Sequence, residues 1–441
     1  MSRKIFLTLL CSFLLTTFVQ FAKAQNQAGM RDMSFGVNGE VIQPYRPLET
    51  IVYFVDTALQ SDGKIVCLTA TDMNSPQYSG FSLIRYNPNG SVDATFGDGG
   101  ISDSSIGNIV QARDMAIQSD GKILVAGVFV VDPSERDFSV VRFNVDGSLD
   151  MSFGENGRVV TDFAGFEEQS IDHVNKMILQ PDGKIILVGS RFCRISDAIM
   201  ARYNPDGTMD NSFGVSGKIV ISLPEQISTR SVGYFFASLQ TDGKIMISGN
   251  VNWQISFPNE TKMEVFISRL NADGSLDTSY ATGGFHRISS SYVTQIKTLP
   301  NNKTFLTFGK YLICFNSDGS IDTQFSHQPP NINGYLPPIM AFDFQSDGKI
   351  VVAGQTGLPF GKDVVLARYF PNGKLDGSFG KNGVVIKRSQ EFLDSRQIII
   401  QPDGKILLGA RLNLANRSYL NLARFLGDAP FESEVNTENV K

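Results

Sequence analysis

In five places along the chain an arginine is followed eight residues later by an aspartate. These pairs are Arg85/Asp93, Arg142/Asp150, Arg202/Asp210, Arg269/Asp277 and Arg368/Asp376, and Arg424 with Asp32 completes the set if the chain ends meet. An arginine–carboxylate pair can bind a ligand, and it can equally form two hydrogen bonds that fix a turn. Because a residue type needed in every repeat generally supports the repeat itself, we interpret these pairs as structural. In one copy Cys314 replaces the arginine, which leaves Asp322 without that partner.

Other residue patterns that could do chemistry are weak. The stretch from Asn144 to Asp150 resembles a calcium loop, but a calcium ion needs more carboxylates at close spacing, and Asp-Gly is an ordinary turn sequence. His173, His286 and His327 lack zinc-ligand spacing. No nucleophile elbow or phosphate loop occurs in a suitable context. We therefore assign no catalytic residue, cofactor or metal. Carboxylate pairs for glycoside hydrolysis would come from different repeats and would leave no linear signature.

A repeat positions all of these residues. Asp-Gly-Lys occurs six times, beginning at Asp62, Asp120, Asp182, Asp242, Asp347 and Asp403, and an altered copy stands at Asn301-Asn302-Lys303. The mean spacing of about 57 residues is typical of solenoids and propellers.

Each repeat predicts four short strands. In one copy these are 112–118, 122–128, 138–144 and 158–163, and Asp-Gly turns follow the first and third strands. No segment after the N-terminus has the apolar periodicity of a helix. Four antiparallel strands per repeat indicate one blade of a β-propeller, so the fold class is all-β.

The second half of the unit recurs as clearly as the first. The stretch 85–97 (Arg-Tyr-Asn-Pro-Asn-Gly-Ser-Val-Asp-Ala-Thr-Phe-Gly) is matched at 142–154, 202–214 and 368–380. Together with the upstream Gln-x-Asp-Gly-Lys-Ile, it resembles the delta-60 repeat family of bacterial exported proteins over residues 29–428. The resemblance implies a β-propeller and implies little about activity.

The two ends of the repeat region predict the number of blades. The last copy stops after its third strand, at 422–428, and the missing part stands at the N-terminus, where 32–42 matches 150–160. We therefore expect a seven-bladed propeller whose last blade is closed by the N-terminal strand pairing with 419–425. In the altered repeat, Pro329 and Pro330 occupy the place of the outer strand. Because proline has no amide donor for a ladder, we expect that strand to be short or missing.

The first 24 residues have a basic start, an apolar core and an Ala-x-Ala end, which indicate a cleaved secretory signal peptide. Its removal changes the formal charge from −5 to −8, which gives no support for nucleic-acid binding. The mature chain is expected to comprise the propeller (25–428) and a polar C-terminal linker or tail (429–441), with no transmembrane segment. We expect a monomer that is secreted or on the cell surface. Cys67, Cys193 and Cys314 form no disulfide framework and are expected to be buried free thiols.

The loops between second and third strands differ in every repeat, whereas the Asp-Gly turns hardly vary. We name the end of the fold that carries these variable loops the variable-loop face; the loops are 71–80, 131–137, 191–197, 250–264, 356–363 and 412–419. Divergent loops on a regular frame are typical of binding sites, and Trp253 and Phe257 in the longest are candidate ligand contacts. The leading hypothesis is a non-enzymatic exported propeller that binds an unidentified protein or glycan through this face. The alternatives are a polysaccharide-active enzyme with carboxylates at the central channel, and a structural spacer of a larger surface protein.

Overall fold

The computed structural model describes residues 28–44, 52–71, 80–103, 109–132, 135–163, 171–192, 197–221, 230–255, 260–289, 293–332, 334–356, 363–388, 392–414 and 417–428. Within these ranges the regular elements are strands, as expected for an all-β fold. The described part of the chain has no helix of the length and apolarity that a membrane crossing requires.

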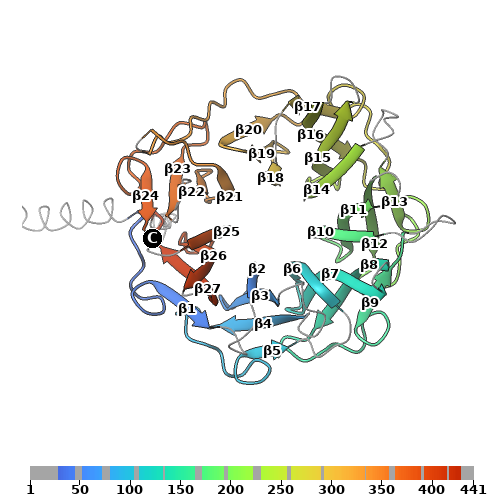
Figure 1. Ribbon diagram of the computed structural model, residues 1–441, viewed down its shortest axis with the longest axis horizontal. Coiled ribbons are helices and arrows are strands. Elements are labelled where there is room, and N and C mark those ends of the chain that lie inside the picture. The colour runs from blue at the N-terminus through green and yellow to red at the C-terminus, as the bar shows by residue number, and fades with distance from the viewer. Residues whose placement is uncertain are drawn as a thin grey trace, which may run out of the picture.

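The strands form six hydrogen-bonded sheets, which Figure 1 shows around a common centre. Four of them contain four antiparallel strands, and these are listed in spatial order: β2 (Val52–Leu59), β3 (Ile65–Thr71), β4 (Phe81–Tyr86), β5 (Ile101–Asp103); β14 (Arg230–Leu239), β15 (Ile245–Ile255), β16 (Glu260–Leu270), β17 (Phe285–Ser289); β21 (Ile339–Phe344), β22 (Ile350–Gln355), β23 (Val364–Tyr369), β24 (Val384–Lys387); and β25 (Phe392–Ile400), β26 (Ile406–Leu414), β27 (Arg417–Phe425), β1 (Glu40–Pro44).

The eight-stranded sheet consists of two such units: β6 (Ile109–Ile117), β7 (Ile123–Asp132), β8 (Glu135–Phe143), β9 (Arg158–Thr161); and β10 (Ile171–Leu179), β11 (Ile185–Phe192), β12 (Asp197–Tyr203), β13 (Lys218–Ile221). One parallel bridge, Ile171 to Arg136, joins them. The sixth sheet has three strands, β18 (Val293–Thr298), β19 (Thr304–Phe308) and β20 (Tyr311–Phe315). In every unit the first strand lies innermost (Figure 1).

The hydrophobic core lies between neighbouring sheets, because both faces of each sheet are covered. One cluster packs Val188 and Met200 of β11 and β12 against Phe235 and Ile247 of the next sheet. This explains why the second strands are apolar on both sides, unlike strands with one wet face.

Hydrogen bonds also link each unit to the next at the edge where the Asp-Gly turns lie. A backbone amide that follows one unit's Asp-Gly turn donates to a carbonyl in the turn of its neighbour at 2.7–3.0 Å: Gly36 to Asn89, Gly97 to Asp146, Gly154 to Asp206, Gly214 to Asp273, Ala281 to Asp318, Ser326 to Asn372 and Gly380 to Ala28. The repeated turn sequence therefore fixes the spacing of the units as well as their own hairpins.

The N-terminal segment pairs with the end of the repeat region, as expected. β1 runs antiparallel to β27 with Glu40 opposite Ala423 and Pro44 opposite Tyr419. In Figure 1 the blue β1 accordingly lies beside the red β27. Arg424 donates its Nε to Asp32 Oδ2 at 2.8 Å across this junction.

The expected defect in the altered repeat is confirmed for the residues that the structure describes. In the described residues between Phe325 and β21, an isolated bridge, Ile332 to Tyr335, is formed, and no strand. The Leu312 amide at the edge of β20 donates to Nδ1 of His327 at 3.4 Å, so a side chain meets part of this edge.

The variable loops were predicted too long. β15 and β16 continue to Ile255 and from Glu260, so most of 250–264 is a paired hairpin, and β7 with β8 (131–137) and β26 with β27 (412–419) extend in the same way. The polar residues of these segments were interpreted as loops. A hairpin that projects beyond the core can be polar and still complete its backbone hydrogen bonds. The expected signal peptide, the tail 429–441, Cys193 and Phe257 lie outside the described residues.

Candidate functional site

The recurring arginine–aspartate pairs lie inside the units. In all six the arginine Nε donates to the aspartate Oδ2 at 2.7–2.8 Å. Each guanidinium lies 4.4–4.9 Å from the ring of an aromatic residue three positions after the aspartate. Both partners are buried. In five units the arginine also donates to a backbone carbonyl of the next unit, so these side chains hold the units together.

The electrostatics of one pair show how the buried charge is balanced. Burial alone would raise the pKa of Asp210, but hydrogen bonds from Ser212 and Lys184 and the charge of Arg202 outweigh it and hold the pKa below the usual value. Where Cys314 replaces the arginine, Lys303 lies 2.7 Å from Asp322, so this aspartate does have a cationic partner.

Carboxylates also occur among the innermost strands, where an active site was one alternative. Asp56 on β2 accepts from the Met115 amide at 3.1 Å, and Asp114 on β6 accepts from the Met177 amide at 2.6 Å and from Lys176 Nζ at 2.7 Å. Burial and the neighbouring Asp114 raise the pKa of Asp56 to about 8. These carboxylates link neighbouring inner strands through backbone amides, so they are committed to the fold.

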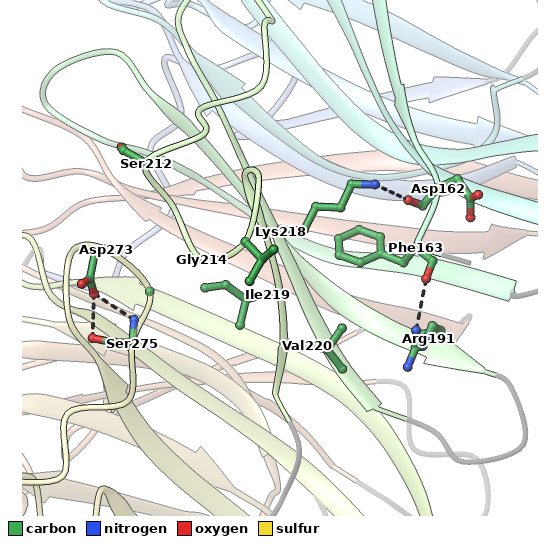
Figure 2. A pocket seen from close by; sticks show the side chains of 12 residues that line it. Asp162, Phe163, Arg191, Ser212, Gly214, Lys218, Ile219, Val220, Asp273 and Ser275 are labelled. Atoms are coloured by element: carbon green, nitrogen blue, oxygen red, sulfur yellow. Dashed lines mark hydrogen bonds between the residues drawn. The ribbon is translucent and has the colours of Figure 1, made fainter. Parts of the chain in front are cut away.

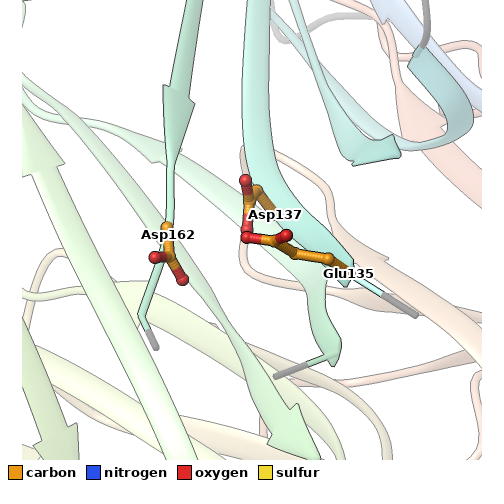
Figure 3. A group of neighbouring side chains, drawn as sticks. All are labelled: Glu135, Asp137 and Asp162. Carbon is orange, nitrogen blue, oxygen red and sulfur yellow. The ribbon is translucent and has the colours of Figure 1, made fainter. Parts of the chain in front are cut away.

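A second group of carboxylates lies on the variable-loop face. Glu135 and Asp137 belong to β8, Asp162 directly follows β9, and one carboxylate oxygen from each lies within 4.8 Å of the others (Figure 3). We name these three residues the carboxylate cluster. Asp137 is buried, and Glu135 and Asp162 are half-buried.

The environment of Asp137 is unusual for a charged side chain. The side chain is only 4% exposed, and its Oδ1 has no hydrogen-bond partner. Burial, together with the charges of Asp162 and Glu135, raises its pKa to about 6, although Lys218 acts in the opposite direction. Perturbed carboxyls of this kind gather at functional sites more often than elsewhere.

A groove of about 660 Å³ begins at the same place. Asp162, Phe163 and Arg191 line one end, Lys218, Ile219 and Val220 of β13 line its length, and residues 273–275 line the other end (Figure 2). We name it the β13 groove. Its mixture of charged, polar and apolar groups is typical of small-molecule sites.

Two cationic side chains fix the shared end of the groove. Lys218 Nζ donates to the Asp162 carbonyl oxygen at 2.7 Å. Arg191 donates to the Phe163 carbonyl at 3.1 Å and to Asp197 Oδ2 at 3.1 Å. The backbone carbonyls of Asp162 and Phe163 are thus each held by a cationic side chain.

Sequence reasoning did not identify this site. Asp137 and Arg191 do lie in segments that were singled out as variable loops, but Asp162 and Lys218 lie outside them. The available signal was the pair of acids at positions 135 and 137, which face the same side of a strand. The predicted contact Trp253 has its backbone in β15, opposite Arg230 and Lys262, and the predicted contact Phe257 lies outside the described residues.

Comparisons with known proteins agree with the fold. The sequence matches a family described as a domain of unknown function (DUF5122) β-propeller over residues 60–96, 118–153, 180–213, 240–280, 308–325 and 345–379. No curated protein matches the chain.

Among solved structures, a polysaccharide lyase, an ulvan lyase bound to -[GlcA(1-4)Rha3S]-, matches with a TM-score of 0.52 and 11% identity over 91% of this chain and 96% of that chain. A second structure of a polysaccharide lyase, also an ulvan lyase, matches with a TM-score of 0.50 and 10% identity over 86% of this chain and 96% of that chain. The α-L-arabinanase of Penicillium chrysogenum in complex with arabinobiose has a TM-score of 0.46 and 12% identity, over 78% and 95%.

These comparisons overturn the leading hypothesis of a non-enzymatic binding propeller, because the matching propeller is a glycan-active enzyme. They fit the alternative of a polysaccharide-active enzyme better. At such low identity the likeness itself establishes the fold alone. The matched repeats and the four-stranded antiparallel sheets support a β-propeller built from repeated units.

Proposed function

We propose that the protein is an exported polysaccharide-active enzyme that binds its glycan in the β13 groove and cleaves it at the carboxylate cluster. The observation that carries the proposal is that the groove and the cluster share Asp162. A glycan lying along β13 would therefore end at several carboxylates, and paired carboxylates are the groups by which most glycosidases act.

The lining of the groove supports a sugar ligand. Ile219 and Val220 offer an apolar wall to the flat face of a sugar ring, while Asp273 and Ser275 lie among the polar groups at the far end. Arg191 and Lys218 hold the backbone near Asp162, which keeps the reacting end in place. Rigid placement of this kind is what catalysis needs from groups that do not react themselves.

The scaffold we propose is a closed seven-bladed propeller. The seven turn-to-turn hydrogen bonds support it, because they link each unit to the next and the last unit to the first. The pairing of β1 with β27 supports closure by the N-terminal strand, and the repeat motifs support membership of the delta-60 repeat family. The basic, apolar and Ala-x-Ala segments of residues 1–24 support export of a mature chain with the propeller at 25–428.

Cleavage assays on a panel of neutral and uronic-acid polysaccharides test the proposal. New reducing ends alone would indicate hydrolysis, whereas unsaturated ends that absorb ultraviolet light would indicate elimination. Asp162→Asn should lower the rate by at least about a hundredfold, because it removes a carboxylate of the cluster at which we place cleavage.

The matched control is Asp206→Asn. Asp206 is an exposed turn residue whose Oδ1 accepts from the Thr208 amide at 2.9 Å, a role that an amide oxygen can keep. Its rate should equal that of the native protein. Binding of a polysaccharide without any turnover, or equal rates for Asp162→Asn and the native protein, would contradict the proposal.

A further inference from the structure

We infer that Glu135, Asp137 and Asp162 form a binding site for one divalent cation of the oxygen-preferring class to which Ca²⁺ belongs. This inference deepens the proposed function, because any part that the cation plays in cleavage rests on that function. The evidence for binding itself is independent of any reaction.

The strand register brings two carboxylates face to face. β8 and β9 are antiparallel, with Phe138 opposite Thr161. One step further along both strands places Asp137 opposite Asp162, and Glu135 projects from the same side of β8 as Asp137. Like charges directly opposite each other destabilise a strand pair. Lys218, whose Nζ donates to the Asp162 carbonyl, supplies one positive charge against three carboxylates, so it offsets the repulsion only in part.

The second observation is the state of Asp137. A carboxylate that is 4% exposed and whose Oδ1 receives no hydrogen bond is costly to bury. Such a group calls for a partner, and its neighbours in the cluster are acceptors rather than donors. A cation bound between the three carboxylates would give Oδ1 of Asp137 a partner and would offset the negative charge of the cluster.

The same position in the repeat shows the usual solution. In the next unit it is occupied by Asp197, which forms an ion pair with Arg191 at 3.1 Å, and in the following unit by Glu264, which lies 3.9 Å from Arg287. At the position of Arg191, opposite Asp137 in the strand pair, the unit that contains Asp137 has Phe129. A bound metal ion would replace the missing arginine.

The geometry fits a calcium-like ion. Oxygen ligands at about 2.3–2.6 Å from Ca²⁺ lie within about 5 Å of each other, and the three oxygens meet that condition at 4.8 Å. An all-carboxylate donor set favours Ca²⁺, Mg²⁺ or Mn²⁺ over metals that prefer nitrogen or sulfur. Three protein ligands leave coordination positions for water or for hydroxyl and carboxylate oxygens of a glycan at the end of the β13 groove.

Calorimetric titration of the EDTA-treated, dialysed protein with CaCl₂, in the absence of glycan, tests the inference. We expect one ion per chain with a dissociation constant of about 0.1–1 mM, in the range of extracellular calcium modules. Asp137→Asn and Asp162→Asn should each weaken binding at least about tenfold, because the affinity depends on the ligand charge.

Glu264→Gln is the control, because it changes the same repeat position in a unit where an arginine already supplies the positive charge and where the residue does not line the β13 groove. It should bind Ca²⁺ as the native protein does, and circular dichroism should show that all variants are folded. In EDTA, Asp137→Asn should also melt at a higher temperature than the native protein, since it removes a like-charge contact. The inference would be overturned if Ca²⁺, Mg²⁺ and Mn²⁺ did not bind at millimolar concentration, or if Asp137→Asn bound Ca²⁺ as the native protein does. Glycan cleavage by a protein that binds no cation would overturn the inference but leave the proposed function standing.

Discussion

Replacing Arg202 by methionine would remove a buried guanidinium that links two neighbouring units. Arg202 is 5% exposed, and its Nε donates to Asp210 at 2.7 Å while the guanidinium lies 4.4 Å from the ring of Phe213. A further N–H donates to the carbonyl of Ala272 in the next unit. Methionine preserves most of the apolar stem and none of the donors, so the variant tests the polar contacts rather than packing volume.

The expected cost follows from what Asp210 retains. Removing one partner of a buried ion pair generally costs about 3–5 kcal/mol, because the other charge stays buried. Asp210 keeps Lys184 at 3.1 Å, and the natural pair Lys303–Asp322 shows that a unit can fold with lysine alone. We therefore expect a loss of about 3 kcal/mol in the free energy of unfolding, at the lower end of the range. Arg202→Met combined with Asp210→Asn should recover part of it.

Urea denaturation monitored by circular dichroism measures this difference at pH 7 and at lower pH. The pKa of Asp210 is held below its usual value in the folded protein, so its contribution is present above the unfolded pKa of about 4 and is lost as the pH falls through the folded pKa. The gap between native protein and Arg202→Met should therefore narrow below about pH 4. A cost under about 1 kcal/mol at pH 7, the range of surface ion pairs, or a gap independent of pH, would refute the reasoning.

Three further predictions concern the frame. Deletion of residues 25–44 should lower the melting temperature or cause aggregation, because it removes β1 from the edge of β27, whereas deletion of 429–441 should not; equal melting of both truncations would argue against closure by this strand. Gly207→Ala should cost more in unfolding free energy than Gly63→Ala, although both glycines have positive φ. A Cβ at Gly207 would lie 2.9 Å from a backbone nitrogen of the preceding unit, whereas a Cβ at Gly63 would lie 3.4 Å from a proline side chain. Thermal denaturation gives the order of the two variants, and the reverse order would be inconsistent with close packing of the turns. Cys67, whose pKa burial raises to about 12, should react with a thiol reagent at pH 8 only after unfolding, and mass spectrometry of the labelled peptide would reveal any reaction in the folded state.

The sequence alone was sufficient to predict the strands and turns of each repeated unit, because the information that specifies them is local. Glycine in each Asp-Gly turn supplies the positive φ that the turn requires, for example +84° at Gly121. Apolar runs on both sides of these turns then predict paired strands, and their recurrence predicts blades. The lack of an outer strand after β20 was predictable for the same reason, because proline cannot donate to a ladder wherever the chain places it.

Burial of the cysteines was predictable from their apolar neighbours, and Cys67 and Cys314 are indeed buried free thiols. The extent of the hairpins was not predictable from local sequence. Residues 250–255 and 260–264 are polar enough to suggest a loop, yet their backbones pair across β15 and β16. Pairing partners of that kind are decided by the neighbouring strand rather than by the residue itself.

Only the tertiary structure decided the candidate site. Asp137 and Asp162 belong to different strands, and nothing in either local sequence indicates that the register of β8 and β9 sets them opposite each other. The carboxylates of Asp56 and Asp114 are no less acidic in sequence, but the fold commits them to backbone amides of neighbouring strands. Whether a carboxylate supports the frame or stays available for a ligand depends on the donors that folding brings to it, and those donors come from other units of the chain.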